Sequence, residues 1–282
     1  MNQSTQFNIQ RKGLFVDEVI LHNGKPLFSF IDINPTELCN RTCSFCPRGI
    51  DYPNQNLHIT EEVIEKIGLD LEEIDFQGMI NICGNGEPLL CDNLIPLISR
   101  LKNFNLEMVT NGDILTEEKI HVLFKNGLNF INISLYDGEH QLDKFNKLLS
   151  KCEISESNYV LRKYWKEPIH LTNRAGSMDN KKPLLLDLDK PCYYMHYSVQ
   201  LDWNGDVLFC CHTLYNKSIT NGNILDSSLK EIWYGDKMTK YRKLLVEGRN
   251  HYPCNQCDAI GTLFGQNFVE SWEEHYNASG GS

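Results

Sequence analysis

Short apolar runs alternate with amphipathic stretches along the first 175 residues of the chain. Runs typical of β-strands lie at 78–83, 106–110, 130–135, 159–162 and 169–171. Helical periodicity, followed each time by a turn or loop signal, lies at 60–69, 92–103, 116–126 and 139–150. This alternation predicts an α/β fold. We expect a partial (β/α)6 TIM-like barrel whose reactive loops follow the carboxyl ends of its strands.

The two ends of the chain have different patterns. Residues 14–31 hold two apolar runs around Asn23 and Gly24, a pair typical of a tight hairpin turn. After about residue 175, polar, turn-rich sequence surrounds one strand–turn–strand unit at 199–211 and one helix at 227–248. We therefore expect four parts, which are a hairpin extension at 1–29, the barrel at 30–175, a small cysteine-rich auxiliary domain at 176–277 and a flexible tail at 278–282.

Composition narrows the class of protein. A net charge of −10 gives no broad basic surface for phosphates, so we expect no nucleic-acid partner. No apolar run approaches the ~18 residues that span a bilayer, and the first residues lack the apolar core of a signal peptide, so we expect no membrane partner. Eleven cysteines without an export signal indicate a reducing compartment. We expect a cytoplasmic protein.

Three cysteines, Cys39, Cys43 and Cys46, lie together in the string TELCNRTCSFCPR. Iron–sulfur clusters are normally held by four thiolates, so this Cys-x3-Cys-x2-Cys spacing would leave one iron open to a ligand that is not protein. The alternatives are zinc with a distant histidine, redox thiols, or chance neighbours. Zinc patterns pair two CxxC-like elements, and a lone triplet therefore favours a cluster.

The ordered motifs CNRTCSFC, GNGEPLL, VTNG and INISLYDG resemble the radical S-adenosylmethionine (SAM) superfamily over roughly residues 30–175. The resemblance implies that three thiolates hold a 4Fe–4S cluster whose open iron binds SAM. It implies reductive cleavage of SAM to a 5′-deoxyadenosyl radical that abstracts a substrate hydrogen. It also implies a flavodoxin- or ferredoxin-like electron donor. In such enzymes the cofactors supply the chemistry and the protein positions them.

The resemblance also assigns SAM contacts residue by residue. The element that contacts the methionine ammonium is matched by Gly84, Asn85, Gly86, Glu87 and Pro88. Asn85 stands where glycine is commoner. Ser134 matches a ribose contact, Arg162 a carboxylate contact, and Phe45 the aromatic position beside adenine. The plainer alternatives are a surface turn, a strand hydroxyl bonded to backbone, a surface arginine and a phenylalanine that packs the loop.

A second set of cysteines resembles the ligands of SPASM or twitch auxiliary domains, namely Cys192, Cys210, Cys254 and Cys257. They would fully ligate one auxiliary 4Fe–4S cluster. Because no cysteine follows Cys257, the chain resembles the single-cluster twitch type. The alternatives are a structural zinc site with four thiolates and Cys211 in place of Cys210, although the spacing from Gly205 favours Cys210. The remaining Cys83, Cys91, Cys152 and Cys211 are by default small buried apolar residues.

Several reactions fit these cofactors. The auxiliary spacing resembles that of twitch dehydrogenases, which implies oxidation of a sugar or cyclitol alcohol to a ketone, with the auxiliary cluster as electron acceptor and Arg174 as a substrate contact. The alternative is an epimerase of a carbohydrate or peptide, in which Cys83 or Cys211 donates a hydrogen atom. A third is modification of a ribosomal peptide, against which the short N-terminal hairpin and the single auxiliary cluster argue. We expect a small-molecule substrate, and a peptide is the alternative.

Overall fold

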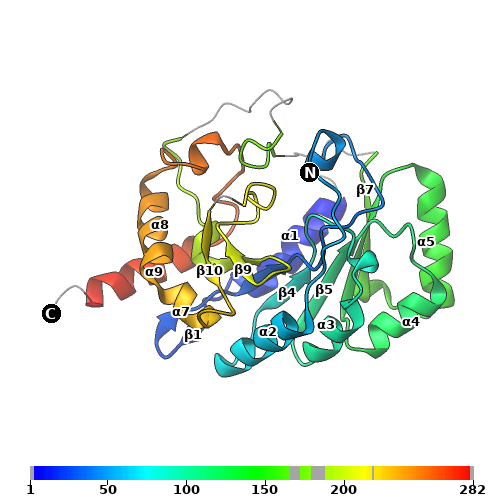
Figure 1. Cartoon of the computed structure of the whole chain (residues 1–282), viewed down its shortest axis with the longest axis horizontal. Coiled ribbons are helices and arrows are strands. Elements are labelled where there is room, and N and C mark those ends of the chain that lie inside the picture. The colour runs from blue at the N-terminus through cyan, green and yellow to red at the C-terminus, as the bar shows by residue number, and fades with distance from the viewer. Residues whose placement is uncertain (1–2, 166–171, 179–187, 218, 280–282) are drawn as a thin grey trace.

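A computed structural model describes residues 3–165, 172–178, 188–217 and 219–279. One eight-stranded sheet, in the order β10-β9-β8-β3-β4-β5-β6-β7, forms the centre of this part of the chain (Figure 1). Its strands are β3 (Phe30–Ile33), β4 (Met79–Ile82), β5 (Asn105–Thr110), β6 (Phe130–Leu135), β7 (Tyr159–Lys163), β8 (Ser198–Leu201), β9 (Asp206–Leu208) and β10 (Thr220–Asn223). The six strands from β8 to β7 are parallel, and β9 and β10 continue the sheet in antiparallel fashion.

These strands confirm the predicted α/β architecture with a parallel-dominated sheet. Four of the predicted runs coincide with β4 to β7, while the run at 169–171 lies outside the described residues. The strand–turn–strand unit at 199–211 forms β8 and β9 of the central sheet. Its first strand, β8, pairs in parallel register with β3, with Asp32 opposite Gln200, so the cysteine-rich segment is joined to the barrel by backbone hydrogen bonds.

Helices cover one face of the sheet through an apolar core. They are α2 (Glu61–Glu73), α3 (Leu94–Arg100), α4 (Glu117–Lys125) and α5 (Glu139–Lys151), close to the predicted ranges. Thr60 and Thr116 cap α2 and α4 by accepting hydrogen bonds from backbone N–H groups of the first turn. Ile31 of β3 and Ile80 of β4 pack on this side, in one cluster with Ile67 of α2. Since side chains alternate along a strand, Phe30, Asp32 and their neighbours face the other side.

That other face is covered, at the amino ends of its strands, by α1 (Gln3–Val16), a helix that the pattern analysis did not predict and that lies behind the sheet in Figure 1. Val16 packs in one cluster with Phe30, Met79, Tyr197 and Phe268. The expected hairpin over 14–31 is therefore wrong at its start and reduces to β1 (Leu21–His22) and β2 (Lys25–Pro26). Its turn is confirmed, because Asn23 and Gly24 both have positive φ, 52° and 73°, as a tight primed turn requires.

The C-terminal part contains α6 (Tyr194–Tyr197), α7 (Leu229–Tyr234), α8 (Asp236–Glu247) and α9 (Gln266–Ser279). The single helix expected at 227–248 is two helices, because Gly235 adopts an extended conformation between them. The start of the expected tail is helical, since α9 reaches Ser279 and buries Trp272. Short 3-10 turns η1 (Pro47–Gly49), η2 (Pro88–Leu90), η3 (Glu156–Asn158) and η4 (Cys254–Gln256) complete the list. Among the described residues, no helix is long and apolar enough to cross a membrane.

Candidate active site

A cavity of about 360 Å³ lies at the carboxyl ends of the parallel strands, on the face of the sheet that α1 covers at the amino ends. The loops expected at this edge meet around it. Of the predicted residues, those that line the cavity are Cys39, Cys43, Cys46, Phe45, Cys83, Gly84, Asn85, Gly86, Glu87, Ser134, Arg162, Arg174 and Cys211. Pro88 is buried behind the wall, where it begins η2. The fold therefore gathers five thiols and a set of polar groups at one opening, although their individual roles stay predictions.

The cysteine loop is held open by polar contacts rather than by secondary structure. The Asn54 side chain accepts a hydrogen bond from the Cys39 N–H and donates one to the Cys39 carbonyl, at 2.9 and 3.0 Å. The Cys46 N–H donates to the Cys43 carbonyl at 3.0 Å. Burial raises the pKa of Cys39, and it raises the pKa of Cys43 to about 11. These thiols would have to lose protons on binding iron, so assembly of a cluster should be favoured by higher pH.

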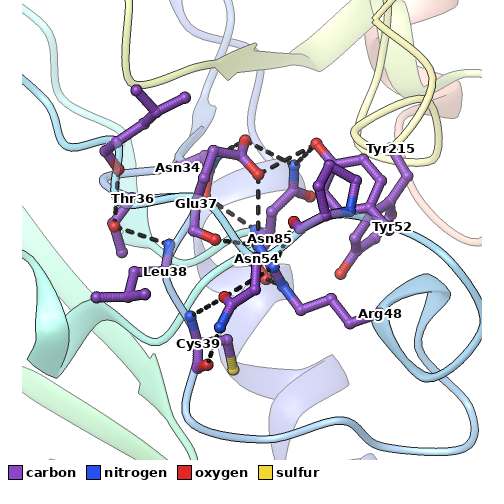
Figure 2. A network of polar contacts seen from close by, with 12 residues as sticks. Asn34, Thr36, Glu37, Leu38, Cys39, Arg48, Tyr52, Asn54, Asn85 and Tyr215 are labelled. Carbon is purple, nitrogen blue, oxygen red and sulfur yellow. Dashed lines mark hydrogen bonds and ion pairs between the residues drawn. The ribbon is translucent and has the colours of Figure 1, made fainter.

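Arg48 organises a buried polar network beneath this loop, which Figure 2 shows. Its guanidinium donates to the carbonyls of Asn85 and Pro53, at 2.8 and 2.7 Å, and to the Glu37 carbonyl. The Glu37 carboxylate lies 3.4 Å from Arg48 and accepts from the Tyr52 hydroxyl at 3.1 Å. Sequence reasoning missed this network, because Arg48 and Asn85 are 37 residues apart along the chain and only folding brings them together.

The GNGEP loop is positioned by the same network. The Asn85 side chain donates to Glu37 at 3.0 Å and to the Leu214 carbonyl at 3.1 Å, so it links the barrel to the cysteine-rich segment. A Cβ on Gly86 would lie 2.4 Å from the Thr36 carbonyl oxygen. The glycine is thus needed for close approach to the loop after β3, a contact within the protein that the sequence argument did not consider.

Glu87 ties this loop to the end of β5. Its buried carboxylate accepts hydrogen bonds from the Thr110 hydroxyl, from the Asn111 N–H at 2.7 Å and from the Leu89 N–H at 3.1 Å. Burial raises the pKa of Glu87, and these hydrogen bonds oppose the rise. Because most of its acceptor capacity is used within the protein, Glu87 acts first as a positioning residue for the loop.

Arg41, which sequence reasoning also missed, clamps the cysteine loop to two other loops. It makes two hydrogen bonds to Asp113, both 2.6 Å, and two to Asp137, at 3.0 and 2.6 Å. Nearby, the ring of Phe45 stacks on Tyr164 with centroids 5.8 Å apart and contacts Tyr136 at 5.4 Å. This aromatic group gives one side of the cavity a flat apolar surface suited to an adenine ring.

The floor of the cavity is polar. Asp32 of β3 and Asn81 of β4 occupy the same register, and the Asn81 amide donates to Asp32 Oδ1 at 2.7 Å. The Cys83 thiol donates to the same oxygen at 3.4 Å. Within the described residues Asp32 Oδ2 accepts no hydrogen bond, and burial raises the pKa of Asp32. Arg174 and Gln200 complete this floor.

A second, smaller cavity of about 20 Å³ lies within the cysteine-rich segment and is lined by Cys192, Cys210, Cys254 and Cys257. All eleven cysteines of the chain are free thiols. Burial raises the pKa of Cys192 to about 11 and that of Cys210 further. In the described part of the chain no three His, Cys, Asp or Glu side chains converge as ligands of one ion do. The four thiols instead surround a space, an arrangement that fits a multinuclear cluster.

The adjacent cysteines Cys210 and Cys211 face different cavities. Cys210 lines the small cavity with the other three cysteines, and Cys211 lines the large one. Arg174 and Ala175 divide in the same way. One thin wall of backbone therefore separates the floor of the large cavity from the second set of thiols. Cys91 and Cys152 are buried in the apolar core, as we expect by default for cysteines outside the two predicted ligand sets.

Comparison with known proteins agrees with this geometry. The radical SAM superfamily model matches residues 33–160, and the iron–sulfur cluster-binding domain model, SPASM, matches residues 192–258. The S-adenosyl-L-methionine-dependent 2-deoxy-scyllo-inosamine dehydrogenase of Niallia circulans is 27% identical over 240 residues, which cover 83% of this chain and 94% of that protein. The crystal structure of BtrN in complex with AdoMet and 2-DOIA superposes with a TM-score of 0.72 at 27% identity, covering 84% and 95% of the two chains.

A more distant structure, anSMEcpe with bound AdoMet, shares the fold at a TM-score of 0.54 and 12% identity, over 89% of this chain and 92% of the other. The first matched domain binds a 4Fe–4S cluster and SAM, and the second binds auxiliary iron–sulfur clusters. The chain belongs to the radical SAM superfamily and carries a C-terminal SPASM-type cluster domain.

Proposed function

We propose that this enzyme oxidises a secondary alcohol of a small cyclitol or sugar to a ketone. One observation carries the proposal, which is that the polar floor around Asp32 and the cavity of four thiols are separated by a single wall at 174–175 and 210–211. An alcohol oxidation must dispose of a hydrogen atom, a proton and an electron. The arrangement offers a separate destination for each. The Niallia circulans relative named above, a cyclitol alcohol dehydrogenase, supports the same class of substrate.

When bound, SAM with its cluster supplies a radical that takes the hydrogen atom from carbon, and an auxiliary cluster accepts one electron. Cys39, Cys43 and Cys46 would hold the first cluster, and Cys192, Cys210, Cys254 and Cys257 the second. The SAM contacts would come from Gly84 to Pro88, Ser134, Arg162 and Phe45. The aromatic group of Phe45, Tyr136 and Tyr164 covers one side of the cavity and would shield a reactive intermediate from water on that side.

Two side chains of the floor would handle the substrate itself. We assign the hydroxyl proton to Asp32, because its Oδ2 faces the cavity without a hydrogen bond from the described residues. Burial raises the pKa of Asp32 toward the range in which a carboxylate is an effective base. Arg174 would donate hydrogen bonds to other hydroxyls of the ring and so select its orientation.

The first test is the metal content and the product. After anaerobic reconstitution, roughly eight irons per chain are expected from two four-iron clusters. Incubation with SAM, a reductant and 2-deoxy-scyllo-inosamine should yield a ketone and 5′-deoxyadenosine. C192A should lower the iron to roughly four per chain and abolish ketone formation while SAM cleavage persists. C152A, which removes a buried cysteine outside both cavities, should change neither quantity. Stoichiometric zinc without a brown chromophore would sink the proposal.

The positions of Cys83 and Cys211 keep an epimerase as the second candidate, because both thiols face the large cavity. An exchangeable thiol would place solvent deuterium at the inverted carbon in deuterium oxide, whereas a dehydrogenase yields an unlabelled ketone. C83A or C211A would abolish epimerisation but leave oxidation intact. A ribosomal peptide as substrate is a third outcome of the same product analysis.

Electrons must also enter the chain. The three loop cysteines are only partly buried, so a cluster held by them would be accessible to a small redox protein. We propose a flavodoxin- or ferredoxin-like donor. A reduced flavodoxin should support SAM cleavage in place of dithionite, and failure of both flavodoxin and ferredoxin would exclude this class of donor.

A further inference from the structure

Helix α1 lies on the same face of the sheet as the cavity, at the amino ends of the strands. We infer that Lys12 of α1 is a positioning residue of the active site, whose fixed positive charge keeps Asp32 available as a proton acceptor. The inference rests on the proposed function in one respect, which is the role given to Asp32. It makes α1 a part of the active site, although neither the motifs nor the cysteines indicate this helix.

The ammonium of Lys12 is held by aromatic rings. Its Nζ lies 4.2 Å from the ring centroid of Phe30, 5.3 Å from that of Tyr197, 5.5 Å from that of Phe264 and 5.7 Å from that of Tyr194. Four rings around one cation form a cage that fixes the position of its charge.

Asp32 is on the same strand, β3, as Phe30, one of the four rings of this cage. Phe30 and Asp32 are two residues apart on β3, so their side chains project from the same face, about 7 Å apart along the strand. The interaction with Lys12 lowers the pKa of Asp32, against burial, which raises it. Without Lys12, the hydrogen bonds from Asn81 and Cys83 would be left to oppose the effect of burial on the pKa of Asp32.

Arg11, the neighbour of Lys12 on α1, shows what a direct ion pair would do instead. Glu107 of β5 lies in the same row of the sheet as Asp32, with Asn81 between them. Arg11 pairs directly with the Glu107 carboxylate and covers the ring of Phe130 at 3.6 Å. Glu107 is thereby neutralised and occupied. Lys12, held in its cage, supplies charge to Asp32 without occupying it, which leaves Oδ2 for a substrate hydroxyl.

Other charged or titratable groups also face Asp32. Cys83, directly after β4, donates to it, Cys211 and Arg174 line the same cavity, and Tyr197 of α6 lies within its electrostatic reach. Of these, Arg174 is the second cation, and it stands on the substrate side. Lys12 is the cation on the protein side, so its effect should persist whether or not a substrate is bound.

The test uses K12M, which fills the cage without charge, and K12R, which restores charge. Infrared difference spectra between the parent chain and D32N, both without clusters, isolate the carboxylate band of Asp32. Its titration midpoint should rise by about one pH unit in the K12M background, because a positive charge that lowers the pKa of Asp32 is removed. K12R should restore the midpoint. K144M is the control, because Lys144 also lies over a ring, that of Phe145 at 4.8 Å, but on the outer helix α5.

The reconstituted enzyme gives the second readout. The acid limb of kcat/KM for ketone formation from 2-deoxy-scyllo-inosamine should move up by the same pH unit in K12M and return in K12R. An Asp32 midpoint that K12M leaves unchanged would overturn the inference, whatever the substrate is. A midpoint that moves in a chain forming no ketone would support the role of Lys12 and refute the proposed function. If K12M does not fold, K12Q provides the same charge removal with a polar side chain.

Discussion

Replacing Arg48 by methionine should remove the support of the whole cysteine loop. The Arg48 side chain is 2% exposed and donates to two buried carbonyls and to the partly buried carbonyl of Pro53, as well as approaching Glu37, whose side chain is 1% exposed. Methionine leaves those carbonyls without their donor and Glu37 without one of its cations. Breaking a buried ion pair in this way costs about 3–5 kcal/mol. That is a large share of the about 5–15 kcal/mol by which folded proteins are stable.

Arg100 is the matched control. It also makes four hydrogen bonds to carboxylates, but Glu65 and Glu72 lie at the surface with side chains 55% and 51% exposed. Exposed ion pairs contribute little, so R100M should leave the urea midpoint almost unchanged. The assay is urea unfolding of the cluster-free chain at neutral pH, with SAM binding measured by calorimetry after reconstitution.

R48M should lower both the midpoint and the affinity for SAM, because Arg48 holds the backbone of Asn85 as well as that of Glu37. Equal midpoints for R48M and R100M would refute the argument that burial decides the strength of these contacts. A lowered midpoint with unchanged SAM affinity would show that the loop keeps its shape without Arg48, and would refute its role in positioning.

Three further perturbations test other parts of the structure. Burial lowers the pKa of His196 to about 3, so the unfolded chain binds one more proton below pH 6.5 and stability falls as pH falls. The loss of stability is about 2 kcal/mol at pH 5, and H196F should remove this pH dependence of the urea midpoint. R41Q should accelerate loss of cluster absorbance to a chelator, and R41K should not rescue it, because a lysine cannot make two bidentate contacts to Asp113 and Asp137. G86A should weaken SAM binding in calorimetry and cost about 1–3 kcal/mol in unfolding, since its Cβ would meet backbone at 2.4 Å.

Local patterns were sufficient for the elements of the barrel. β6 coincides with the predicted run because all six of its residues, FINISL, are buried, so the run is continuous and bounded by turn signals. The capped helices α2 and α4 were equally readable, since threonine precedes an amphipathic stretch in each. The two cysteine sets line two different cavities, as their spacing along the chain grouped them, and their role as cluster ligands stays a prediction.

What the patterns missed depends on contacts between distant segments. α1 has only a weakly amphipathic sequence, and its position follows from Arg11 and Lys12 meeting acids and rings of the sheet. One signal for the floor was nevertheless available. The strands FIDI and MINI each contain one polar residue, Asp32 or Asn81, and FINISL contains two, Asn132 and Ser134, in otherwise apolar runs. A polar side chain in a buried strand of a barrel is a candidate for the site.

The junction of β8 with β3 gives the proposed reaction a fixed geometry. Asp32 and Gln200 are partners across this junction, and the segment after β8 is fastened again at its far end, where Lys217 bridges Glu37 and Asp202. The Asn34 side chain adds a hydrogen bond of 2.7 Å to Asp202. A domain on a flexible tether could vary its distance from the substrate. Here the thiols of the second cavity cannot move away from the floor without breaking a sheet and a buried ion network. In the proposed reaction, the fold itself therefore sets the separation between the site of proton removal and the site of electron acceptance.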